Sequence, residues 1–242
     1  MGEAWLRGDE PKSPELLARY HAALRELERG VPFAYAVGSV GFRTLDLAID
    51  PRALIPRPET EGLVERVLGR CSTGLVADIG TGCGCIALSL AVEGHFDKVV
   101  AVEQSPAAAA LARENVKRIA PSTPVEVREG NMLAPLDRAE RFRAIVSNPP
   151  YLTSADHADL DASVAGFEPR EALVSGSDGL DATRGLFAEA GALLEPGGLL
   201  ALEIDERRAD AVRNVGRRFG WNVEIYDDLF GCPRYALSIK EA

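Results

Sequence analysis

Short apolar runs that alternate with helical segments constrain this chain's fold more than any other feature. From about residue 71, five runs have the length and content of buried strands: Leu75–Ile79, Val99–Glu103, Val125–Val127, Ala144–Ser147 and Leu199–Ile204. The segments between them have helical spacing: Cys85–Glu93, Pro106–Ile119 and Asp181–Leu194. Continuous apolar strands separated by helices indicate a parallel sheet covered on both faces.

The C-terminal end departs from this alternation. After a helix at about 206–219, two further strands are expected at Val223–Tyr226 and Tyr235–Ile239. Only about eight residues join them, which is too short for a crossover helix, so they should form an antiparallel hairpin. The expected fold is an α/β, Rossmann-like, doubly wound sheet of seven mostly parallel strands with an antiparallel C-terminal hairpin.

The N-terminal third has a different organisation. Helical spacing over 14–29 ends at Gly30, and an alternating stretch then predicts a β-hairpin arm with its turn near Gly38 and Gly41. A linker helix follows, with Thr60 as its expected N-cap. The chain should therefore divide into a short helical segment, an arm with linker helix, and a main α/β domain: 1–30, 31–70 and 71–242.

Composition limits the class of protein. A hydrophobic content of 46% in 242 residues is enough for a full core. No apolar run approaches the roughly 20 residues that span a bilayer, and the N-terminus has no apolar signal segment. A net charge of −10 disfavours stable nucleic-acid binding. The four cysteines have neither disulfide nor zinc spacing, so we expect a cytoplasmic protein with no metal.

The segment "LVADIGTGCGCIALSLA" places a glycine-rich loop between a strand and a helix. Such glycines let the backbone turn sharply and approach a ligand. Asp78 either caps nearby backbone N–H groups or orients the polar end of a ligand, and both roles are compatible. Cys83 and Cys85 are expected to be small packing residues. The candidate binding residues here are Asp78, Gly80, Thr81, Gly82, Cys83 and Gly84.

The next predicted strand ends in Glu103, about 25 residues further along the chain. A carboxylate at that position commonly holds ribose hydroxyls, so the loop and the acid together fit an adenosine-containing cofactor. The spacing is GxGxG, without the features of a phosphate clamp. This favours S-adenosylmethionine over NAD(P), while a purely structural turn is the remaining alternative.

The stretch "AIVSNPPYL" ends a predicted buried strand on two prolines. Proline cannot donate to a sheet ladder, so the strand must stop there. Taken alone, the motif is either a tight turn or a site that grips a planar amide or base.

Together, these motifs resemble the class I methyltransferases, and "SNPPY" resembles those that methylate planar nitrogens. "ALIPRPETEGLVE", followed by "GFEPREAL", "DGLDATRGLFAEA" and "LFGCPRYAL", is similar to the HemK/PrmC family. These enzymes are protein-(glutamine-N(5)) methyltransferases of peptide chain release factors. The resemblance implies methyl transfer from S-adenosylmethionine to the release-factor GGQ glutamine, with S-adenosylhomocysteine as product.

The resemblance also implies roles for individual residues. The Asn148 side-chain oxygen and the Pro149 carbonyl would accept hydrogen bonds from the glutamine amide, and Tyr151 would pack on its plane. Asn131 and Met132 would lie on the adenine side of the cofactor. Further residues are expected on the substrate side: Pro150, Phe33, Arg57 and Glu59.

Departures from the family pattern keep alternatives open. Family members usually carry several N-terminal helices, whereas about 30 residues precede the arm here. Asn131 stands where the family usually has Asp, and Asp205-Glu206 has no functional explanation. The alternatives are methylation of a flipped nucleic-acid base, methylation of a ribosomal-protein glutamine, and a cofactor-binding protein without activity.

Overall fold

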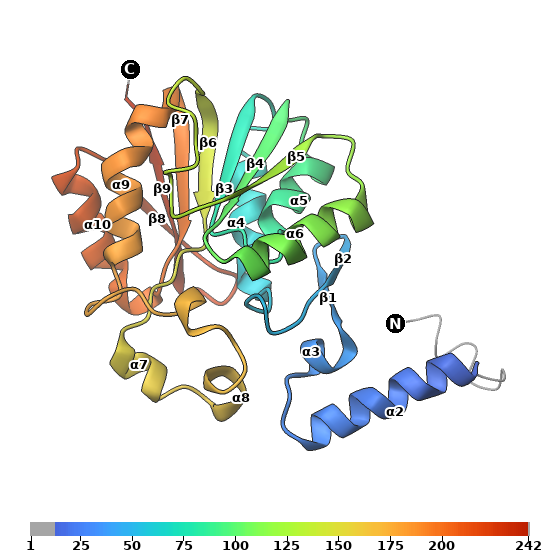
Figure 1. Cartoon of the computed structure of the whole chain (residues 1–242). Coiled ribbons are helices and arrows are strands. Elements are labelled where there is room, and N and C mark those ends of the chain that lie inside the picture. Colours follow the sequence, from blue (N-terminus) through green and yellow to red (C-terminus); the bar gives the residue numbers. More distant parts are fainter. Residues whose placement is uncertain (1–12, 242) are drawn as a thin grey trace.

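A seven-stranded sheet forms the centre of the molecule in the computed structural model, which describes residues 13–241 (Figure 1). Its strands lie in the order β5-β4-β3-β6-β7-β9-β8. The first five strands pair in parallel, and β9 is antiparallel to both β7 and β8, which confirms the predicted fold. The strand bounds are β3 Leu75–Ile79, β4 Lys98–Glu103, β5 Val125–Glu129, β6 Phe142–Ser147, β7 Leu194–Glu203, β8 Glu224–Asp227 and β9 Pro233–Ile239.

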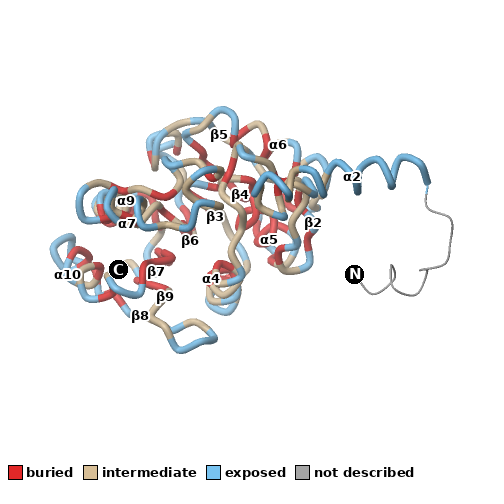
Figure 2. The backbone as a smooth tube through the Cα atoms, turned by 90° about the horizontal axis from the view of Figure 1, so that it is seen from below, coloured by how far each residue is buried: buried red, intermediate tan, exposed pale blue. Residues whose placement is uncertain are grey.

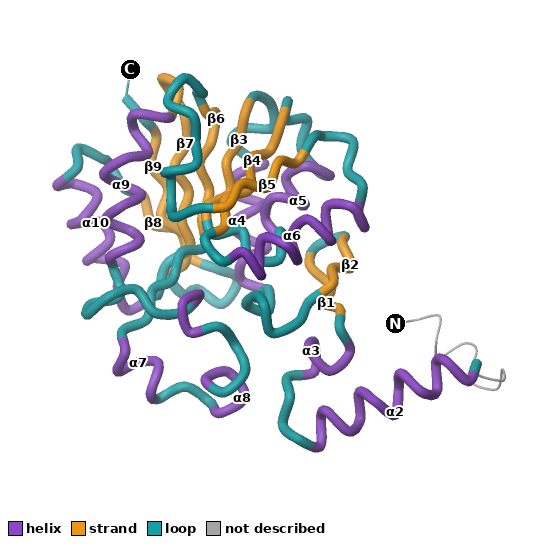
Figure 3. The backbone as a smooth tube through the Cα atoms, viewed as in Figure 1, coloured by secondary structure: helices purple, strands orange, loops and turns teal. Residues whose placement is uncertain are grey.

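Helices cover both faces of this sheet (Figure 3). The first apolar layer contains side chains of α4 (Pro58–Leu68), α5 (Cys85–Glu93) and α6 (Pro106–Ile119), and the second contains those of α9 (Asp181–Leu193) and α10 (Ala209–Arg218). Side chains along a strand alternate between the two layers, as Ala144 and Ile145 do in β6. Both layers are apolar, so the strand sequences are continuous apolar runs.

The predicted N-terminal helix is α2 (Pro14–Glu28), capped by the Ser13 side chain. None of its side chains is buried, and its apolar residues Leu16, Leu17, Tyr20 and Leu24 are exposed (Figure 2). The first 12 residues of the predicted segment 1–30 lie outside the described residues, and so does most of the N-terminus in which no signal segment is expected. A short helix that sequence reasoning did not predict, α3 (Phe33–Val37), follows.

The hairpin arm is formed by β1 (Ser39–Phe42) and β2 (Leu45–Ala48), but the predicted turn position is wrong. Gly38 ends α3 and Gly41 lies within β1. The turn is at Arg43-Thr44, and Arg43 has a φ of 50°. Contacts from elsewhere in the chain hold that conformation: the Arg43 N–H donates to Glu61, and its guanidinium pairs with Glu65 and Glu93.

The expected N-cap of the linker helix is also wrong. Helix α4 begins at Pro58, with Arg57 in the N-cap position, so Thr60 lies inside the first turn. Proline suits that first position because it has no N–H to leave unpaired. The Thr60 hydroxyl donates to Glu203 at the end of β7.

Between β6 and α9, the chain crosses the edge of the sheet where the parallel strands end. This stretch contains α7 (Ser154–Ala158), α8 (Ala162–Ala165) and a 3₁₀ turn (Arg170–Ala172), none of which was predicted. Among residues 13–241, no helix is long and apolar enough to cross a membrane.

Close packing of α4 against β9 predicts a size limit at Gly62. A Cβ atom there would collide with the Tyr235 hydroxyl and lie 2.8 Å from its ring carbon Cζ. We expect Gly62→Ala to lower the free energy of unfolding by about 1–3 kcal/mol, measured by urea denaturation. Gly41→Ala is the matched control, because its Cβ would have no neighbour within 4 Å. Equal stability of the two variants would contradict this packing.

Candidate active site

A cavity of about 580 Å³ lies at the edge of the sheet where the parallel strands end. Loops after four strands line it, and the opposite wall comes from residues 169–176 and the start of α9. Eight predicted site residues line this cavity: Gly80, Gly82, Glu103, Asn131, Met132, Asn148, Pro149 and Pro150. The other eight are not part of its lining: Asp78, Thr81, Cys83, Gly84, Tyr151, Phe33, Arg57 and Glu59.

The glycine loop turns through three positive φ angles, 73° at Gly80, 58° at Gly82 and 90° at Gly84. A Cβ added to Gly80 or Gly82 would meet no atom of the described residues within 4 Å, so these two positions are open toward the cavity. Gly84 instead packs against Leu88 and begins α5. The loop therefore offers bare backbone to a ligand at two positions and close helix packing at the third.

Asp78 lies fully buried beneath this loop. Its Oδ2 atom accepts hydrogen bonds from the Thr81 hydroxyl at 2.5 Å and the Ala87 N–H at 3.1 Å, so the capping role is present. Burial raises the pKa of Asp78 to about 7. Its Oδ1 atom has no hydrogen-bond partner among the described residues. Asp78 thus shapes the loop from below and has one acceptor atom still free.

Glu103, at the end of β4, holds two loops together. One carboxylate oxygen accepts from the Gly82 N–H and the other from the Ser105 N–H, each at 2.9 Å. A carboxylate oxygen can accept a second hydrogen bond, so both atoms retain capacity for hydroxyl donors in the cavity.

The loop after β5 has unusual backbone geometry. Gly130 has a φ of 148°, and Met132 has a φ of 51°, a conformation that costs a non-glycine residue about 1–2 kcal/mol. A side chain at Gly130 would press on Pro135 at 2.5 Å. This geometry places Asn131 and the apolar Met132 side chain on the cavity wall.

At the end of β6, the Asn148 side-chain nitrogen donates to the Thr60 hydroxyl oxygen at 3.2 Å. Thr60 in turn donates to Glu203 at 2.7 Å. Thr60 and Glu203 are both only 2% exposed, and burial raises the pKa of Glu203 to about 7. Sequence reasoning missed both residues in this role. The available signal was that Glu203, like Glu103, is a carboxylate at the end of an apolar strand.

The two prolines after Asn148 have no N–H groups to donate to a neighbouring strand. Hydrogen bonds to a segment outside the sheet hold the next two residues. The N–H groups of Tyr151 and Leu152 both donate to the Leu173 carbonyl. Burial raises the pKa of the Tyr151 hydroxyl to about 12. Tyr151 is not among the residues that line the cavity, and its expected packing on a substrate amide stays a prediction.

Three residues expected on the substrate side, Phe33, Arg57 and Glu59, are not part of the cavity lining. Arg57 pairs at 2.6 Å with Glu168, whose side chain is 1% exposed. Phe33 is 61% exposed and is not a core residue. Sequence reasoning also missed part of the lining, which includes Arg52–Leu54 from the arm and residues 169–176.

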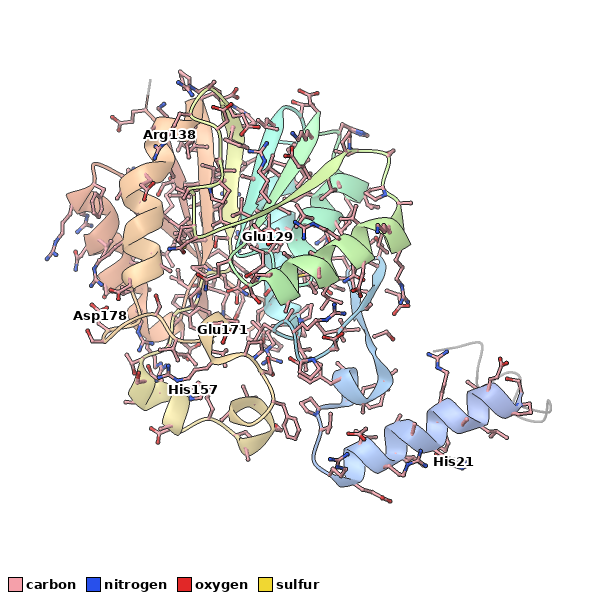
Figure 4. The ribbon with its side chains drawn as sticks, in the orientation of Figure 1. His21, Glu129, Arg138, His157, Glu171 and Asp178 are labelled. Carbon is pink, nitrogen blue, oxygen red and sulfur yellow. The ribbon has the colours of Figure 1, made fainter. Side chains whose placement is uncertain are left out.

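No group of three or more potential metal ligands occurs within residues 13–241. Figure 4 shows His21 on α2 and His157 on α7, on opposite sides of the lower part of the molecule. The same view places Glu171, which lines the cavity, near the end of the sheet. The polar groups on the cavity lining are carboxylates, amides, serine hydroxyls, backbone atoms and the guanidinium groups of Arg52 and Arg170.

Comparison with known proteins shows a methyltransferase fold. Residues 59–165 match the family model described as the methyltransferase small domain. A methyltransferase from Pyrococcus furiosus shares the fold at a TM-score of 0.62, with 21% identity over 93% of this chain and all of that chain. The 16S rRNA N2 G1207 methyltransferase of T. thermophilus shares it at 0.58, with 20% identity over 84% of this chain and 49% of that one.

The relatives found by sequence identify the enzyme family more narrowly than the fold does. The release factor glutamine methyltransferase of Moorella thermoacetica is 41% identical over 97% of this chain and 84% of the relative. Those of Deinococcus radiodurans and Xylella fastidiosa are 41% and 44% identical, over 95% and 88% of this chain and 82% and 78% of the relatives. The chain belongs to the family of release factor glutamine methyltransferases, as its motifs predict.

Proposed function

We propose that this protein transfers a methyl group from S-adenosylmethionine to the side-chain amide nitrogen of a glutamine in a peptide chain release factor. The observation that carries the proposal is the position of Asn148 and Pro149, which share one cavity with the glycine loop and Glu103. Family membership narrows the acceptor to a protein glutamine.

The residues present fit the cofactor. Gly80 and Gly82 leave room for close approach to the backbone, and Glu103 has acceptor capacity for ribose hydroxyls. Asn131 and Met132 would flank the adenine, where the Asn131 carbonyl oxygen can replace the acceptor that the family usually has. When bound, S-adenosylmethionine supplies an electrophilic methyl group on a positively charged sulfur and leaves as S-adenosylhomocysteine. The buried Asp78 carboxylate would favour that positive charge.

The acceptor nitrogen needs help because its lone pair is delocalised into the amide carbonyl. We assign the Asn148 side-chain oxygen and the Pro149 carbonyl as acceptors for the two N–H groups of the glutamine. Such preorganised acceptors favour the positive charge that develops on the nitrogen as the bond to carbon forms. The proton can then pass to water, so no strong general base is required. Tyr151 is assigned the role of anchoring the prolines through its backbone bond to Leu173.

We assign a separate role to each of two predicted parts of the chain. Residues 71–242 would bind the cofactor and carry the amide-binding motif. Residues 31–70 would help hold the substrate, because Arg52–Leu54 line the cavity and Phe33 is exposed on α3. In this proposal, Arg57 and Glu59 position α4 rather than contact the glutamine.

Methylation of a nucleic-acid base is the second candidate, because the tetrapeptide also resembles that of enzymes that methylate the amino groups of adenine and guanine, and the fold is shared with an rRNA guanine methyltransferase. The net charge of −10 weighs against an extended phosphate-binding surface.

The acceptor can be identified by incubating the protein with S-adenosylmethionine that carries a labelled methyl group and, in parallel reactions, release factor, ribosomal proteins, tRNA, rRNA and DNA. We expect label only on release factor, at a glutamine. Asn148→Ala should lower kcat by roughly 100- to 1,000-fold while cofactor affinity stays within about threefold, because only the amide-binding acceptor is lost. Label confined to nucleic acid would overturn the proposal, and undiminished turnover would remove Asn148 from it.

Cofactor binding tests the carboxylate at the end of β4. Removing the Glu103 side chain deletes two hydrogen bonds that shape the loops and the proposed ribose contact. We expect Glu103→Ala to weaken S-adenosylhomocysteine binding about 10- to 100-fold in isothermal titration calorimetry. The control is Glu129→Ala, at the neighbouring position of β5, where the side chain pairs with Arg113 instead. Equal effects of the two substitutions would contradict the assignment.

A further inference from the structure

Three residues that are remote in sequence form one hydrogen-bonded chain that ends at the cavity. Asn148 follows β6, Thr60 lies in the first turn of α4, and Glu203 ends β7. The Asn148 nitrogen donates to the Thr60 oxygen, and the Thr60 hydroxyl donates to Glu203. Only Asn148 lines the cavity, whereas Thr60 and Glu203 are buried behind it.

We propose that Glu203 is a positioning residue, which acts through the Thr60 hydroxyl to fix the Asn148 side-chain amide with its nitrogen inward and its oxygen toward the substrate. The proposal rests on the proposed function, because it explains how Asn148 presents an acceptor to an amide nitrogen. It assigns Glu203 no contact with the substrate.

The direction of the two hydrogen bonds follows from the single proton of the Thr60 hydroxyl. While Thr60 gives that proton to Glu203, its oxygen can only accept, so Asn148 must turn its NH₂ group inward. An asparagine amide is nearly symmetric in shape, and packing alone selects poorly between its two orientations. The buried carboxylate therefore decides which atom of Asn148 faces the cavity.

Protonation of Glu203 would reverse the direction of both hydrogen bonds. A neutral carboxyl group can donate to the Thr60 oxygen, and the Thr60 proton is then free to point at Asn148. The amide would turn its oxygen inward and present NH₂ to the cavity, where it would oppose the N–H groups of the substrate. Ionised Glu203 holds the productive orientation, because it can accept from Thr60 but cannot donate to it.

The surroundings of Glu203 place this change in an accessible pH range. Burial raises the pKa of Glu203 to about 7, and the nearby Glu59 charge adds to the rise. Arg234 and the hydrogen bond from Thr60 favour the charged form. Tyr151 and Tyr235 are the other titratable groups coupled to it, and burial raises the pKa of each to about 12, so both stay neutral at this pH. The productive form is thus populated above pH 7 and lost as the pH falls below it.

Enzyme kinetics at saturating cofactor test the proposal. For a group with a pKa near 7, the ionised fraction falls about tenfold between pH 8 and pH 6, and the wild-type kcat should follow it. Glu203→Gln does not titrate, and its side chain can either accept from Thr60 or donate to it, so Asn148 keeps the productive orientation in part of the molecules at every pH. The variant should keep kcat at pH 8 within about tenfold of wild type and give a nearly flat profile down to pH 6. Burial also raises the pKa of Asp78 to about 7, so another group could cause a fall of kcat in this range. If kcat of Glu203→Gln falls between pH 8 and pH 6 as it does in the wild type, Glu203 is not the group responsible and the proposal is overturned.

The Thr60 position supplies a matched pair of variants. Thr60→Val keeps the shape but removes the hydroxyl, so kcat should fall about 10- to 100-fold with unchanged S-adenosylhomocysteine affinity. Thr60→Ser should restore both kcat and the pH profile. If Thr60→Val has the wild-type kcat, the hydroxyl does not position Asn148.

A readout independent of turnover separates this proposal from the proposed function. In the ¹⁵N-labelled protein, the Asn148 side-chain NH₂ signals should shift with a midpoint near pH 7 in the wild type and stay constant in Glu203→Gln. Asn148→Ala identifies the signals by their loss. Identical titration in wild type and Glu203→Gln would overturn the positioning role, whatever substrate the protein methylates.

Discussion

The parallel pairing of β4, β3, β6 and β7 is the constraint on which the whole site depends. Parallel strands end at the same edge, and here each of the four delivers a polar group there. Asp78 near the end of β3, Glu103 ending β4, Asn148 just after β6 and Glu203 ending β7 are brought together by the strand registers. These residues are spread over 126 positions of the sequence, from Asp78 to Glu203. They come close together because each strand ends at the same edge of the sheet.

Two of these groups create a conflict between stability and activity. Burial raises the pKa values of Asp78 and Glu203 to about 7, from ordinary values of 3.8 and 4.5. The folded state therefore binds protons more tightly than the unfolded chain, so these groups favour folding at low pH and that contribution is lost as the pH rises through 7. The proposed positioning of Asn148 needs Glu203 ionised, in the range where this cost is greatest. Continuous apolar layers on both faces of the sheet offset it.

Sequence patterns predicted the parts of the fold that depend on local composition. The strands of the sheet were recognisable because both faces are buried. Half of the predicted site residues lie on the cavity wall, and five of those eight come from the glycine loop and the Asn-Pro-Pro-Tyr motif. The errors came from distant contacts. The turn at Arg43 depends on Glu61 and Glu93, and Thr60 bonds to a residue 143 positions away instead of capping its helix. The roles of Glu203 and of the cavity wall at 169–176 have the same origin, because no local pattern encodes which side chains meet.

We propose above all that the amide nitrogen bound by Asn148 and Pro149 belongs to a release-factor glutamine. Mass spectrometry of release factor from cells with and without this protein tests it most directly. We predict that the peptide containing the GGQ glutamine carries one added methyl group on the glutamine side chain in cells with the protein and none in cells without it. An unmethylated glutamine in both, or equal methylation in both, would contradict the account.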